Sequence, residues 1–224
     1  IQGTVAPGTE TGQLMVTKAD GTKTLLGVTV TVGKKQGQKI ITVNPDPTKS
    51  ATPIQDAIDF ADPGDLILVP PGYYRESVIL WKPVQLQGWG AYSTVINAVM
   101  APADRVQEWR HKIQTLVMQG EVDLLAGQEV AFDPGAIEPA TLFREEGAGL
   151  LVLAKNQAPE NGGFGQMWAP RVDALSFSGS ANGGGIVVNG SAHHLQISNT
   201  RVFGNQGVLG GGIRIGHPDV TVEA

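Results

Sequence analysis

The chain has 224 residues, enough to bury a sizeable core as one domain or one and a half. Its formal net charge is −5 and its 16 Lys and Arg are scattered, which excludes the basic patch that nucleic acid or an anionic membrane requires. The lack of cysteine excludes disulfides, thiolate catalysis and Cys-ligated zinc, and no stretch approaches the ~20 apolar residues of a membrane span.

Residues 1–33 are predicted to form β structure. Apolar residues alternate with polar ones on both sides of an AspGly turn signal at 20–21, namely Leu14 and Val16 before it and Val28, Val30 and Val32 after it. The segment GTVAPGTETGQLMVT…GVTVTVG resembles the last strands of an immunoglobulin-like IPT/TIG domain. This resemblance implies that the first half of such a domain is missing. The alternative is a hairpin packed on the neighbouring domain.

The chain begins IQGTVAPG, without an initiator Met or a signal peptide, so we expect a piece of a larger protein. Residues 34–51 are predicted to be a linker and a lead-in strand. A helix of about two turns should follow, with Thr52 as N-cap, Pro53 at its first position and Gln55 in a capping box. Its apolar face would contain Ile54, Ala57 and Ile58.

Four short strands are predicted after this helix: DLILV, SVIL, VQLQG and TVINA, all within residues 65–98. The segment PPGYYRE at 70–76 is expected to be a bend between the first two. Their spacing alone also permits hairpins, so the choice of fold depends on internal repeats.

One repeated element is Gly-rich and then alternates: GAGLLVL at 147–153, GGGIVVNG at 183–190 and GGGIRIG at 210–216. The predicted inward pairs are Leu150/Val152, Ile186/Val188 and Ile213/Ile215, and the predicted outward residues are Leu151, Val187 and Arg214. Stacking such segments about 4.8 Å apart would build aliphatic columns, in which each buried residue contributes roughly 1.5–3 kcal/mol.

A second element is predicted to follow each time: VQLQG at 84–88, LSFSG at 175–179, LQISN at 195–199 and VTVEA at 220–224. The expected inward pairs are Val84/Leu86, Leu175/Phe177, Leu195/Ile197 and Val220/Val222. Gly88, Gly179 and Asn199 would then share one turn position, since Gly and Asn accept a left-handed backbone at little cost.

The segment IQDAIDFADPGDLILVPPGYYRESVILWKPVQLQG resembles the N-terminal part of right-handed parallel β-helix proteins of the pectate-lyase-like superfamily. The resemblance covers roughly residues 40–99 and 147–224. It implies an all-β fold, a parallel β-helix of three to four coils over residues 52–224, closed by the N-terminal helix. It implies almost nothing about chemistry.

Residues 100–146 interrupt the repeats. APADRVQEWRHKIQTLVMQG at 101–120 is predicted to be an amphipathic helix, and residues 127–147 a loop with a short second helix. Such an insertion either builds a binding surface or packs flat over the barrel, and flat packing is the simpler expectation.

The catalytic groups known in pectin-degrading enzymes of this fold are acidic calcium ligands with a basic proton abstractor, or paired acids. Neither arrangement is present, and HisProAsp at 217–219 lacks the leading Asp of an epimerase box. His193 and His194 are adjacent, so in an extended chain their side chains would project to opposite sides and could not readily bind one metal ion together. We therefore expect no catalytic residue, metal or cofactor in this chain.

Aromatic residues are the candidate ligand-binding groups, because sugars stack on exposed aromatic rings. Those singled out are Tyr73, Tyr74, Trp81, Trp89, Tyr92 and Trp168. The alternative is that Trp81 and Trp89 cap the coils or pack against the insertion.

The sequence therefore favours a secreted or cell-surface module that is not an enzyme, a scaffold or a carbohydrate-binding adhesin whose partner is a polysaccharide. The alternative is part of a polysaccharide lyase or glycoside hydrolase with its catalytic coils beyond Ala224. An uncovered last coil would leave sheet edges exposed, so we also expect self-association through that end.

Overall fold

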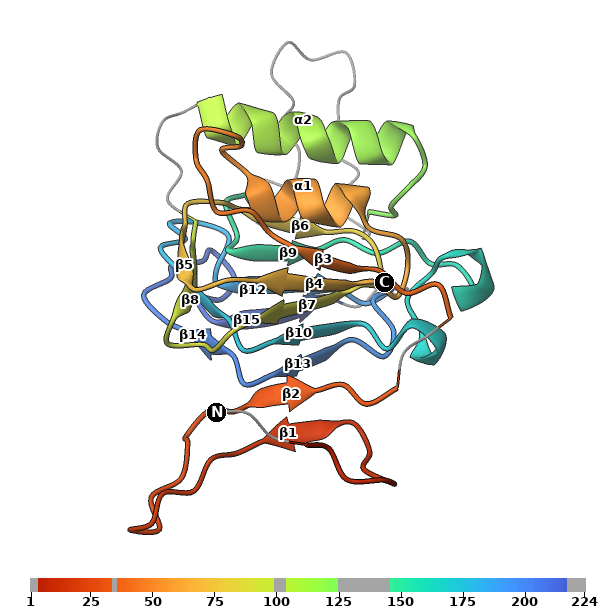
Figure 1. Ribbon diagram of the computed structural model, residues 1–224. Coiled ribbons are helices and arrows are strands. Elements are labelled where there is room, and N and C mark those ends of the chain that lie inside the picture. Colours follow the sequence, from red (N-terminus) through yellow and green to blue (C-terminus); the bar gives the residue numbers. More distant parts are fainter. Residues whose placement is uncertain (1–3, 34–35, 99–103, 125–145, 217–224) are drawn as a thin grey trace, which may run out of the picture.

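We describe a computed structural model of residues 4–33, 36–98, 104–124 and 146–216. Within these ranges the chain is mostly β-sheet with two α-helices, and nearly all its strands belong to three parallel sheets (Figure 1). The prediction of a mostly-β fold with parallel sheets is confirmed.

Three parallel sheets contain most of the strands. The first sheet joins β13 (Gln196–Ser198), β10 (Arg171–Asp173), β7 (Gln85–Gly88), β4 (Leu66–Val69) and β3 (Ile40–Thr42), in that order. The second joins β14 (Arg201–Val202), β11 (Ser176–Ser178), β8 (Thr94–Asn97) and β5 (Gly72–Tyr74). The third joins β15 (Ile213–Gly216), β12 (Ile186–Asn189), β9 (Leu150–Val152) and β6 (Val78–Leu80).

Consecutive strands visit the three sheets in turn. The chain passes through β4, β5 and β6, and then returns to the first sheet for β7, β8 and β9. We call each such set of three strands a rung, and the described residues form four rungs preceded by β3. Two 3₁₀ turns, η2 (Pro159–Asn161) and η3 (Gln166–Trp168), lie in the link between the second and third rungs.

Side chains in equivalent positions stack from rung to rung because neighbouring strands pair in register. The predicted pairs Leu150/Val152 and Ile186/Val188 occupy successive strands of the third sheet and belong to one buried core, as expected. The first sheet contributes Leu86, Val172 and Ile197 to the same core in the same way.

The predicted alignment of the second repeated element is wrong at LSFSG. Phe177 lies on the second sheet, where it pairs with Ile96 and Val202, and the strand that pairs with VQLQG and LQISN is β10. β10 escaped prediction because its outward residues Arg171 and Asp173 are polar although buried.

Gly88 and Asn199 share one position as predicted, since both align with Ala174, but Gly179 does not share it. Asn199 is equivalent to Ala174, and both adopt a positive φ, 49° and 56° respectively. Gly179 lies at the next corner with a φ of 77°. At Gly88 glycine is required by space, since a Cβ there would lie 2.2 Å from the carbonyl oxygen of Ala174.

The helix α1 (Pro53–Phe60) closes the first rung and buries Ile54, Ala57 and Ile58, as predicted. Its expected capping box is absent, because the Thr52 side chain makes no capping hydrogen bond. The carboxylate of Glu76 takes that place.

The helix α2 (Asp104–Met118) confirms the predicted amphipathic helix and covers the outer face of the third sheet. Trp109, Ile113 and Leu116 form a second buried cluster with outward residues of the sheet, among them Leu151 and Val187. The expectation of flat packing is confirmed for this helix, and the second helix predicted within 127–147 lies almost wholly outside the described residues.

The N-terminal strands β1 (Gly12–Leu14) and β2 (Val28–Val30) form an antiparallel pair, and an outer bridge joins Thr17 to Lys23 around the predicted turn. The pair is attached to the first sheet through Asp173, whose side chain accepts hydrogen bonds from the Thr29 N–H and hydroxyl at 2.8 and 2.9 Å. These bonds favour a hairpin docked on the sheet, and they do not bear on an IPT/TIG origin.

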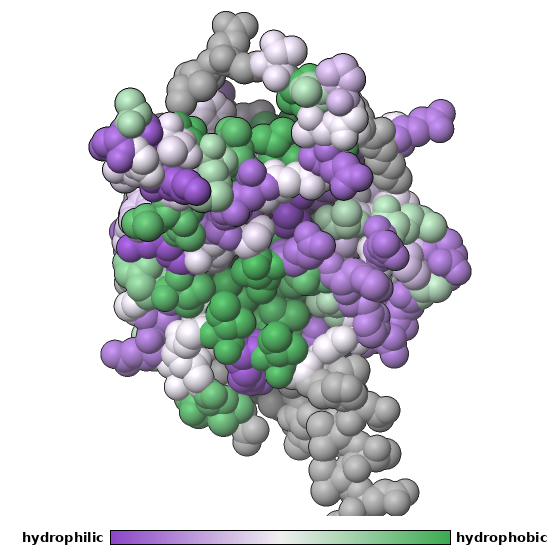
Figure 2. Space-filling view, turned by 90° about the horizontal axis from the view of Figure 1, so that it is seen from below, coloured by the Kyte–Doolittle hydropathy of each residue, from purple (hydrophilic) through white to green (hydrophobic). Residues whose placement is uncertain are grey.

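The two ends of the stack of rungs differ. α1 closes one end, whereas in the fourth rung Ile213 and Ile215 are 51% and 74% exposed, although Ile186 in the rung before is fully buried. Figure 2, which looks at the molecule from below, shows apolar side chains gathered in the middle of that face.

Candidate functional site

Three of the predicted aromatic residues gather where the first and second sheets meet. Tyr73 on β5 points outward because its neighbour Tyr74 points into the core, and Trp89 and Tyr92 lie on the loop that leads into β8. The three side chains are 62%, 58% and 64% exposed. Their rings are therefore available to a ligand.

The loop from Trp89 to Ser93 is held against the second sheet. The Gly90 carbonyl accepts the N–H groups of Ser93 and Thr94 at 2.9 Å each, which closes a tight turn. The Ser176 hydroxyl donates to the Ala91 carbonyl, and the Gly72 N–H donates to the Ser93 carbonyl. The loop thus presents its aromatic residues from a fixed base.

Arg201 completes this surface. Its guanidinium lies 4.3 Å from the ring centroid of Tyr92 and 4.7 Å from that of Phe203, so the two rings flank one cation. Within the described ranges Arg201 forms no ion pair with a carboxylate. We call Tyr73, Trp89, Tyr92, Arg201 and Phe203 the aromatic surface.

The register of the second sheet fixes the length of the aromatic surface. Tyr73 pairs with Val95, Val95 with Ser176, and Ser176 with Arg201. Three strand spacings of about 4.8 Å place the backbones of Tyr73 and Arg201 about 14 Å apart.

The other three predicted residues lie elsewhere. Tyr74 is only 5% exposed and its hydroxyl donates to the Pro70 carbonyl, and burial raises its pKa. The Trp81 indole donates to Asp59 at 2.8 Å and the Trp168 indole to the Pro159 carbonyl at 2.7 Å. Trp81 therefore supports the helices, in line with the alternative interpretation given for it.

Arg201 and Phe203 were missed in the sequence. The misassigned repeat placed no strand at 201–202, so nothing indicated that TRVFG lies beside the loop containing Tyr92. A correct alignment of TVINA, LSFSG and TRVFG would have brought them together.

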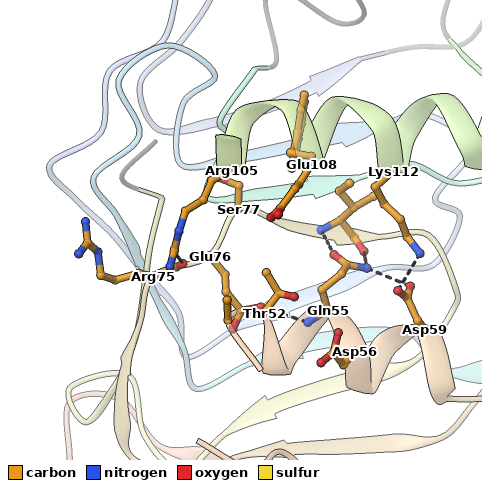
Figure 3. Close-up of a pocket in the computed structure, with 13 residues that line it drawn as sticks. Thr52, Gln55, Asp56, Asp59, Arg75, Glu76, Ser77, Arg105, Glu108 and Lys112 are labelled. Carbon is orange, nitrogen blue, oxygen red and sulfur yellow. Dashed lines mark hydrogen bonds and ion pairs between the residues drawn. The ribbon is translucent and has the colours of Figure 1, made fainter. Parts of the chain in front are cut away.

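Apart from the aromatic surface, the structure has a cavity of about 220 Å³ between α1, α2 and the residues that lead into β6 (Figure 3). Its polar lining ties these elements to one another. Gln55 accepts the Ile79 N–H at 2.8 Å and donates to the Ile79 carbonyl at 3.1 Å, and Lys112 forms an ion pair with Asp59 at 2.7 Å.

Glu76 is the most perturbed acid in this cavity. It is 4% exposed, and its carboxylate accepts the N–H groups of Ile54 and Gln55 at 3.1–3.2 Å. Burial raises the pKa of Glu76 to about 7, although these two N–H groups oppose the shift, and Asp56 adds to it while Arg105 lowers it. Because both oxygens contact the helix terminus, the geometry indicates a structural cap.

The described residues contain no group of three His, Asp or Glu side chains able to hold a metal ion. No α-helix among the described elements is long and apolar enough to cross a membrane. HisProAsp at 217–219 lies outside the described residues, and His193 and His194 remain isolated from other candidate ligands in the parts that the structure covers.

Comparison with known proteins identifies no relative: no family model, no curated protein and no solved structure matches this chain. The geometry of the aromatic surface is therefore the feature of this chain that points to a function.

Proposed function

We propose that this chain is a non-catalytic module of a secreted or cell-surface protein, and that it binds a polysaccharide through the aromatic surface. We further propose that the scaffold of the chain is a right-handed parallel β-helix of the pectate-lyase-like type. Residues 1–33 are proposed to be the last strands of an IPT/TIG-like domain.

The arrangement of strands supports the β-helix part of the proposal. Three parallel sheets, visited in turn by four rungs, are what a chain wound into a three-sided coil requires, and a crossover between parallel strands is right-handed in nearly all proteins. The sequence resemblance at residues 40–99 points the same way.

One observation carries the binding part of the proposal: Tyr73, Trp89 and Tyr92 are all more than half exposed on a single firmly held corner. Large aromatic side chains gain free energy when they are buried, so an exposed group of them indicates a ligand. Rings offer flat faces to the C–H groups of sugars, and Arg201 offers N–H donors to their oxygens.

The test is a glycan array probed with the purified chain, followed by alanine variants at Tyr73 and Tyr92. We expect selective binding, weakened about tenfold or more by either variant, because each removes a stacking contact worth about 1.4 kcal/mol. Phe60→Ala is the matched control, since Phe60 is an equally exposed ring on α1. Its binding should equal that of the unmodified chain.

The same glycans should be tested for new reducing ends and for unsaturated products. Turnover by this chain would contradict a non-catalytic role and favour the lyase or hydrolase alternative. Failure to bind any glycan would leave a plain scaffold.

A further inference from the structure

The cavity between α1 and α2 has an apolar floor. Ile79 of β6 and Trp109 of α2 line it and are only 1% and 5% exposed. Its volume of about 220 Å³ exceeds the roughly 150 Å³ of an apolar cavity that binds benzene. The space is therefore sufficient for one substituted aromatic ring.

Most of the charged groups around this floor already have partners. Lys112 forms its ion pair with Asp59, and the Arg105 guanidinium donates a hydrogen bond to the Arg75 carbonyl oxygen. The Glu76 carboxylate accepts N–H groups at the start of α1. These bonds tie the walls of the cavity to one another.

Glu108 is the exception among the acids of α2 that line the cavity. Its side chain points from α2 toward α1 (Figure 3) and is exposed. It forms no hydrogen bond or ion pair with any residue that the structure describes. A carboxylate without a partner at the edge of an apolar space favours a positively charged group on a ligand.

The charges around Glu76 favour a cation as well. Burial is the main cause of the raised pKa of Glu76, and among its charged neighbours Asp56 affects this pKa more than Arg105 does. Asp56 lies on α1 and also lines the cavity. A cation in the cavity is therefore attracted by acids on both helices.

We propose that this cavity binds a small organic cation, whose apolar or aromatic body lies against Ile79 and Trp109 and whose ammonium group donates to the Glu108 carboxylate. Such a charge-assisted hydrogen bond is stronger than one between neutral groups. A neutral ligand of the same shape lacks this bond, and an anion is repelled by Glu108. The cavity is separate from the aromatic surface, so this proposal does not depend on the proposed function.

The experiment titrates the full chain, isotopically labelled for NMR, with benzylamine, benzyl alcohol and benzoate. These probes share one ring and differ in charge. We expect benzylamine to shift the resonances of Ile79, Glu108 and Trp109 with a Kd of about 1 mM or lower. Its affinity should be at least about tenfold higher than that of benzyl alcohol or benzoate.

Glu108→Gln keeps the shape of the side chain and removes its charge. This variant should bind benzylamine at least about tenfold more weakly and should leave the affinity for benzyl alcohol unchanged. Glu160→Gln is the matched control, since it removes the same charge at an exposed residue that does not line the cavity. Its affinity for benzylamine should equal that of the unmodified chain.

Three results would overturn the proposal. Benzyl alcohol or benzoate might bind as tightly as benzylamine, which would mean that the charge of the ligand is not recognised. Unchanged binding of benzylamine by Glu108→Gln would exclude Glu108 as its partner. If no probe shifts the resonances of the cavity residues at about ten times the expected Kd, the cavity takes no such ligand.

Discussion

Glu76 and Lys82 lie on either side of β6 and reach the two ends of α1. The Glu76 carboxylate accepts N–H groups at the start of the helix, and the Lys82 ammonium donates to the carbonyl oxygens of Asp59 and Ala61 at its end, at 2.6 and 2.8 Å. An acid at the N-terminus and a base at the C-terminus both oppose the charge of the helix dipole. These two residues therefore dock the helix along the strand.

We predict that ionisation of Glu76 makes the free energy of unfolding depend on pH. Its folded-state pKa of about 7 lies above the ordinary 4.5, so the folded chain binds more protons than the unfolded chain between these values. Protonation of the Glu76 carboxyl therefore adds to the free energy of unfolding in full below about pH 4.5, and this contribution is lost as pH rises through 7. We expect the free energy of unfolding to fall by roughly 3 kcal/mol over this range.

Glu76→Gln cannot titrate and keeps one carbonyl oxygen for the helix N–H groups, so its unfolding free energy should lose most of this slope. Urea unfolding at pH 4.5, 5.5, 6.5 and 7.5 measures the effect in both proteins. Parallel curves for the two would contradict the assignment of the pH dependence to Glu76.

Among the elements, α2 illustrates how a polar insertion joins the core. Its Trp109, Ile113 and Leu116 face the outward side chains of the third sheet, including Leu151 and Val187. Those sheet residues would otherwise expose apolar surface, so the helix converts an outer face into a second buried layer.

We predict that Ile113→Ala destabilises the chain by about 2–5 kcal/mol, because Ile113 is fully buried between the helix and the sheet. Met118→Ala on the same helix is the control, since Met118 is 68% exposed, and it should change the unfolding free energy by less than about 0.5 kcal/mol. Chemical denaturation of both variants gives the comparison. A small effect at Ile113 would mean that the helix is only loosely attached.

The elements with strict apolar alternation could be predicted from the sequence. GGGIVVNG and GGGIRIG gave the strands of the third sheet with their inward residues, and VQLQG and TVINA gave strands of the other two. β5 was predicted as a bend, since its three residues follow two prolines, and β10 was missed because its buried outward residues are Arg171 and Asp173.

The candidate site was predictable only in part. Residue type pointed to Tyr73, Trp89 and Tyr92, but type cannot distinguish an exposed ring from the buried Tyr74 beside it. The place of Arg201 depends on which strand pairs with β11, and a local pattern does not determine that pairing. Position within the sheet, and not composition, separates the exposed candidate residues from core residues here.

In the whole molecule, the ends of the stack of rungs are closed to different degrees. Gln55 of α1 covers the outer edge of β6, whereas among the described strands β13, β14 and β15 each pair with a strand on one side only. Ile213 and Ile215, on β15, are more than half exposed. Unpaired strand edges beside apolar side chains favour association with another chain.

We predict that the chain self-associates through this end and that Ile215→Lys weakens the association at least about tenfold, because it would place a charge within the apolar contact. Met118→Lys, which adds the same charge at an exposed site on α2, is the control and should leave the association unchanged. Sedimentation velocity over a range of concentrations measures both. A single monomeric species at every concentration would contradict the prediction.

The cover that α1 provides for the first rung also affects the order in which the strands unfold. Among the described strands, local opening costs least where a strand has a single neighbour and exposed side chains, so we expect fraying to begin at β15 and to move rung by rung toward α1. Loss of one rung leaves the strands of the next rung without a neighbour. We expect this progression to end at α1, which Glu76 and Lys82 hold by hydrogen bonds at its two ends. We therefore expect local unfolding to proceed from the fourth rung to the first, and the first rung with α1 to open last.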